Sequence, residues 1–161
     1  MKKIFFCVLY LVVSVVAVKG NIFVQAFHKE DYYAVMRSNS LEKINEMLTE
    51  LKVSSFSEKE AYEGALLMKK AGLVGPPLEK LNLFKSGRKK LEAMIQTNNS
   101  NVEYRFLRLM IQENAPKILN YKNELADDCA VVKKSYKKLS PLLQQIILDY
   151  SQTSKKLNLK D

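Results

Sequence analysis

A polar stripe crosses one of the most apolar segments of the chain. Arg105, Arg108 and Gln112 lie within the stretch from Ser100 to Pro116. At about 100° per residue, their side chains fall on one side of a helix, in a band roughly 60° wide. A guanidinium holds a carboxylate through two parallel hydrogen bonds. The three residues are therefore the candidate binding residues, as a clamp for an acidic group of a partner.

The same stripe has two structural explanations. It can be a narrow edge exposed to solvent, or it can face acids of the next helix. Glu124, Asp127 and Asp128 are the nearest such acids along the chain. A buried guanidinium needs one of them, because an unpaired charge in the interior is strongly destabilising. The sequence leaves these three arrangements open.

No residue pattern indicates catalysis or metal binding. His28 is the only histidine, and no cysteine or second histidine stands at metal-ligand spacing from it. Cys129 falls within a repeating apolar seam, which is typical of a core side chain rather than a nucleophile. Phosphate-binding glycine loops and hydrolase motifs do not occur. We therefore expect no catalytic residue, no metal and no cofactor, and we rank a hydrolase with carboxylates in a helical cleft last.

The first twenty residues have the pattern of a cleaved secretory signal peptide. Lys2 and Lys3 precede an apolar run over 4–18. This run is shorter than the roughly 20 residues of a membrane-spanning helix. Small residues at Ala17 and Gly20 predict cleavage after one of them. An uncleaved anchor is the alternative.

The rest of the chain has the composition of one folded domain. The sequence has 161 residues and a net charge of +9, three units of which come from lysines in 1–20. Cys129 is the only cysteine after residue 20, which excludes an intrachain disulfide framework. The excess positive charge is compatible with anionic lipid or polysaccharide. Export makes nucleic acid the least expected anionic partner.

Apolar residues recur every three or four positions, which predicts helices rather than strands. Helices are expected over about 29–37, 41–52, 58–71, 77–96, 101–115, 122–139 and 141–152. Ser40 and Ser140 are predicted N-caps, and Ser57 and Ser100 each begin an S-x-x-E capping box. Gly87 lies within an apolar stripe, where its missing side chain allows a neighbouring helix to approach closely.

The sequence thus predicts an all-α fold of six to seven antiparallel helices with short connections. A single helical domain is expected over 21–154. A flexible tail is expected over 155–161.

The segment "FKSGRKKLEAMIQTNNSNVEYRFLRLMI", residues 84–111, resembles the junction between two tetratricopeptide repeats. A helix with a small residue and a late apolar pair is followed by a polar turn and a helix with an aromatic start. The resemblance covers about one repeat of roughly 34 residues. Asn98 and Asn99 stand where the family has a proline. The resemblance implies a degenerate helical-repeat array, with an irregular bundle as the other possibility.

The runs "AYEGALLMKKAGLVGPPLEKLNLFKSGRKKLEAMI" and "VEYRFLRLMIQENAP" also resemble a group of small exported bacterial proteins of unknown function. That resemblance implies a location in the periplasm or at the cell surface of a bacterium. We therefore predict an exported, non-catalytic helical module that binds a protein or peptide partner. Peripheral binding to an anionic membrane or glycan surface is the alternative.

Overall fold

The computed structural model describes residues 27–159, so the predicted signal peptide lies outside the described residues. Within this range the chain forms seven α-helices and no strand, which confirms the all-α prediction. The helices are α1 (Lys29–Arg37), α2 (Leu41–Val53), α3 (Lys59–Ala71), α4 (Pro77–Thr97), α5 (Val102–Asn114), α6 (Leu125–Ser135) and α7 (Pro141–Ser151). Two short 3₁₀ segments, η1 (Lys117–Leu119) and η2 (Tyr136–Lys138), join them.

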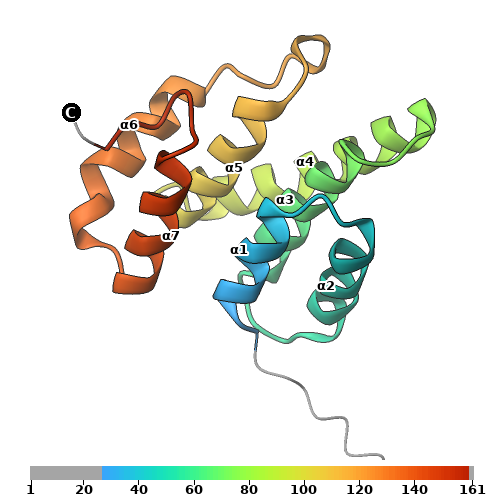
Figure 1. Ribbon diagram of the computed structural model, residues 1–161, viewed down its shortest axis with the longest axis horizontal. Helices are drawn as coiled ribbons and strands as arrows, with labels where there is room; N and C mark the ends of the chain where they lie inside the picture. Colours follow the sequence, from blue (N-terminus) through green and yellow to red (C-terminus); the bar gives the residue numbers. More distant parts are fainter. Residues whose placement is uncertain (1–26, 160–161) are drawn as a thin grey trace, which may run out of the picture.

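Helix α5 lies at the centre of the fold. Figure 1 shows α5 between α6 and α7 on one side and α1 and α3 on the other, with α4 lying alongside α3. None of the helices that the structure describes is both long and apolar enough to cross a lipid bilayer.

Several helix starts follow directly from the sequence. The Ser40 side chain accepts a hydrogen bond from an amide in the first turn of α2, and Ser140 does the same for α7. Pro77 and Pro141 occupy the first turns of α4 and α7, where a missing N–H is harmless. These starts explain why the predicted and observed boundaries of α2, α4 and α7 differ by no more than a residue.

The two predicted capping boxes are wrong. The residue before α3 is Glu58, not Ser57, and its side chain caps nothing. The N-cap of α5 is Asn101, not Ser100, and its side chain accepts from two backbone amides. Glu103 does not turn back to the N-cap residue, because its carboxylate is held by side chains of other helices.

The α3–α4 contact depends on two facing glycines. A Cβ on Gly64 would lie 2.7 Å from the carbonyl oxygen of Gly87 and 2.7 Å from the amide nitrogen of Leu91. A Cβ on Gly87 would overlap the carbonyl oxygen of Gly64. Only glycine permits this backbone separation. The sequence predicted a close approach at Gly87 and did not identify Gly64.

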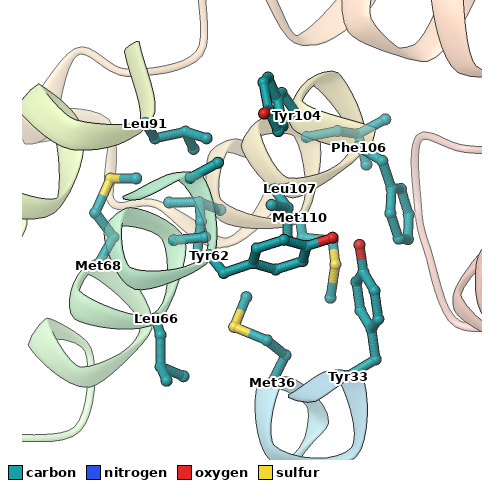
Figure 2. Packing of buried hydrophobic residues seen from close by; sticks show 14 of the residues in the cluster. Tyr33, Met36, Tyr62, Leu66, Met68, Leu91, Tyr104, Phe106, Leu107 and Met110 are labelled. Atoms are coloured by element: carbon teal, nitrogen blue, oxygen red, sulfur yellow. The ribbon is translucent and has the colours of Figure 1, made fainter. Parts of the chain in front are cut away.

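A continuous apolar core joins the helices. Figure 2 shows side chains of α1, α3 and α5 meeting in this core, with Tyr33 and Tyr62 close to Met110. Cys129 is also buried and unpaired. Burial raises the pKa of its thiol, and the nearby acids Glu113 and Asp128 raise it further. This environment supports the interpretation of Cys129 as a core side chain.

A flexible tail was predicted over 155–161, and the described part of this segment, residues 155–159, is docked against the fold. Leu157 is fully buried. The Ser154 hydroxyl and the Lys155 backbone amide donate to the Glu113 carboxylate at 2.7 and 2.5 Å. A buried leucine and a shared acceptor therefore hold residues 155–159 against α5, and the last two residues lie outside the described range.

Replacing Gly64 with alanine should destabilise the fold by about 2 kcal/mol, because a methyl group at the α3–α4 crossing forces the backbones apart. Urea unfolding followed by circular dichroism measures this. Gly75→Ala is the control, since a Cβ there meets no atom within 4 Å, and it should be neutral or slightly stabilising. Equal effects of the two substitutions would show that the crossing tolerates a side chain.

The docked segment should make stability depend on the protonation of Glu113. Burial acts to raise the pKa of Glu113, but hydrogen bonds from Tyr150, Ser154 and two backbone amides outweigh burial and lower it. A depressed pKa stabilises the fold above the ordinary glutamate value of about 4.3, and that contribution is lost as pH falls through the lower folded value.

The difference in unfolding free energy between the native protein and Glu113→Gln should therefore be large near pH 7 and shrink below about pH 4. Glu46→Gln, an exposed change on α2, should give a small difference at every pH. A difference for Glu113→Gln that stays constant with pH would rule out this linkage.

Candidate functional site

Arg108 joins three helices through a buried ion-pair network. Its Nε and Nη2 donate to the two carboxylate oxygens of Asp128 on α6, at 2.7 and 2.9 Å. Its Nη1 donates to Glu92 of α4 at 2.8 Å. Arg108 is 4% exposed and Asp128 is fully buried. Because the pairing is bidentate, it fixes the orientation of α6 against α5 as well as neutralising both charges.

The other two predicted residues also meet acceptors of the protein itself. Arg105 shares Asp128, with Nη1 at 3.0 Å from Oδ1, and also donates to Asn99 in the turn before α5. Gln112 is fully buried, and its Nε2 donates to Glu124 at 3.1 Å. The structure thus brings the stripe together and pairs it internally, with Asp128 and Glu124 as partners, while Asp127 is exposed.

This pairing changes how the stripe can take part in binding. Its guanidinium groups already pair with carboxylates of the protein itself, in the way that a clamp would pair with a carboxylate of a partner. A role for Arg105, Arg108 and Gln112 in binding stays a prediction, and it would have to act through Glu92 and Glu124, which they hold.

Those two acids line an open groove on the outer side of α4. The groove has a volume of about 420 Å³. Its lining comprises Lys85, Arg88, Lys89, Glu92 and Gln96 of α4 and Glu124 from the turn before α6. The lining therefore combines three exposed basic groups with two carboxylates that are anchored from inside the protein.

The buried side chain of Tyr121 contacts two residues that line the groove. Its hydroxyl donates to Glu92 at 2.5 Å, and the guanidinium of Arg88 lies over its ring, 4.8 Å from the centroid. Burial raises the pKa of Tyr121, and the bond to Glu92 raises it further, so the phenol stays a donor. The ring also packs edge-on against Phe84. Arg88 and Glu92 are thus both positioned by one buried aromatic residue.

A second buried acid has a structural role. Glu103 of α5 accepts from the hydroxyls of Tyr33 and Tyr62 at 3.1 and 2.7 Å, and from the Lys29 ammonium at 2.6 Å. Burial raises the pKa of both tyrosines, and the charge of Glu103 adds to the shift. These donors come from α1 and α3, so Glu103 joins both helices to α5, and it does not line the α4 groove.

Sequence reasoning missed Glu92, Tyr121 and Glu103. The first two lie on different elements, and no spacing in the sequence connects them. Glu103 fits the S-x-x-E pattern of a capping box, so the sequence predicted a local contact for it and not its hydrogen bonds to Tyr33 and Tyr62. His28 is exposed and makes no capping bond at the start of α1. Over residues 27–159, no three or more His, Cys, Asp or Glu side chains gather as metal ligands would.

The chain matches no protein-family model, no curated protein and no solved structure with which it was compared.

Replacing Asp128 with asparagine should destabilise the protein by about 3 kcal/mol, because Arg108 would keep its charge in the interior and lose its main counter-ion. Chemical unfolding at pH 7 measures the change. Asp127→Asn is the matched control on the adjacent exposed position, and it should alter stability by no more than about 0.5 kcal/mol. Similar values for the two variants would mean that the buried pair contributes little.

Proposed function

We propose that this protein is a non-catalytic binding module that holds a protein or peptide partner in the groove on α4. The observation that carries the proposal is the arrangement of charge in that groove. Lys85 and Lys89 are exposed, and neither pairs with an acid within residues 27–159. In the same lining, Glu92 and Glu124 are held in place by Arg108 and Gln112.

A polypeptide supplies groups that match both the lysines and the carboxylates of the groove. Its acidic side chains pair with the two lysines, and its backbone amides or basic side chains donate to the carboxylates. Because internal bonds already fix the carboxylates, little side-chain ordering accompanies binding on that side, which favours affinity. Small neutral ligands would leave these charges uncompensated.

The predicted signal peptide supports the location of such a partner. Residues 1–20 have the pattern of an export signal, which favours a partner in the bacterial periplasm or at the cell surface. The alternative function, contact with an anionic membrane or glycan, is supported by a separate group of lysines on α6 and η2 that surrounds another hollow.

Reversing the charge at Lys85 and Lys89 should abolish partner binding. In pull-downs from bacterial envelope extracts at low salt, the variant Lys85→Glu with Lys89→Glu should lose the proteins that the native chain enriches. The reason is that two attractive contacts become repulsive.

The matched control is Lys43→Glu with Lys52→Glu, which changes net charge equally on exposed positions of α2 and should keep the same partners. Circular dichroism should show equal helix content in both variants. If both variants lose the same partners, binding depends on the overall charge of the protein and not on the groove. If the groove variant keeps all its partners, the groove is not the binding site.

A further inference from the structure

A second hollow lies where α6 ends and η2 begins. Its volume is about 400 Å³, within the range of small-ligand sites. Its lining comprises Lys133, Lys134, Tyr136, Lys137, Lys138 and Leu159. None of these lining residues is acidic, and within residues 27–159 Lys134, Lys137 and Lys138 form no ion pair with an acid.

The local backbone brings these charges together. Helix α6 ends at Ser135 and the 3₁₀ segment η2 follows directly, so Lys134, Lys137 and Lys138 lie within little more than one helical turn. Like charges about one turn apart repel one another, by a few tenths of a kcal/mol per pair in an α-helix. The arrangement is therefore unfavourable by itself and becomes favourable when an anion lies between the charges.

The docked C-terminal segment completes the hollow. Leu159 lines it, and the burial of Leu157 holds that part of the chain in place.

We propose that this hollow binds a ligand that carries clustered phosphate groups. Several ammonium groups need several anionic oxygens, and linked phosphates present these at high density, whereas one carboxylate does not. Lysine acts as a point-charge donor to phosphate oxygens. The Tyr136 hydroxyl is a further donor, and Leu159 offers an apolar contact for the part of the ligand that carries the phosphates.

The test uses two probes that differ in the source of the phosphates. Inorganic tripolyphosphate is titrated into the protein by calorimetry, with sodium sulfate at equal ionic strength as the reference anion. Vesicles of phosphatidylglycerol, with phosphatidylcholine vesicles as the reference, are used for co-sedimentation. The binding variant is Lys134→Gln with Lys138→Gln, and the matched control is Lys43→Gln with Lys52→Gln on α2.

We expect at least one probe to bind, and the Lys134/Lys138 variant to weaken that binding at least about tenfold, since each lost charged hydrogen bond contributes about a factor of ten or more. The α2 control should stay within about twofold. Tripolyphosphate binding alone supports a soluble phosphate ligand, vesicle binding alone supports lipid headgroups, and binding of both supports either source.

Two outcomes would overturn the proposal. The first is that neither probe binds better than its reference. The second is equal weakening by the binding variant and the α2 control, which would indicate general charge rather than a site. Both variants change exposed side chains, and circular dichroism checks that they fold.

Discussion

A charge in a protein interior has to be paired, and α5 carries two buried charges and one partly buried charge that point in three directions. Glu103, Arg108 and Glu113 are five positions apart, so each is rotated by about 140° from the one before it. Glu103 reaches α1 and α3, Arg108 reaches α4 and α6, and Glu113 reaches α7 and the C-terminal segment. The positions of all the other helices except α2 therefore depend on polar contacts with one central helix.

The same pairing explains the character of the surface. Acids such as Asp128, Glu92 and Glu103 form hydrogen bonds or ion pairs in the interior or at its edge. The surface around the lysines of α4, α6 and η2 therefore carries an excess of positive charge. The α4 groove keeps two carboxylates among its basic groups, whereas the α6–η2 hollow has none in its lining. The linings of the two surfaces thus differ in charge, since one is mixed and the other contains only basic charged groups.

The sequence predicted most of what depends on neighbours along the chain, although both capping boxes were wrong. Apolar spacing located the helices, Ser40 and Ser140 marked two starts, and Gly87 indicated a close contact. It did not identify features that need a partner distant in sequence. The tyrosines around Glu103 and the burial of Leu157 are of this kind. A single polar or apolar residue can contact many different residues elsewhere in the chain, and its own type does not say which one. The arginine stripe was located, but only the fold could show which acids face it.

The glycine crossing between α3 and α4 also affects how distant relatives of this protein can be recognised. Most outward positions on the two helices accept side chains of any size, so their identities carry little information about ancestry. Gly64 and Gly87 have no such freedom, since each occupies the space that the other's side chain would need. A chain with little overall similarity that keeps two small residues at the corresponding positions of a long helical hairpin would be a candidate for the same architecture.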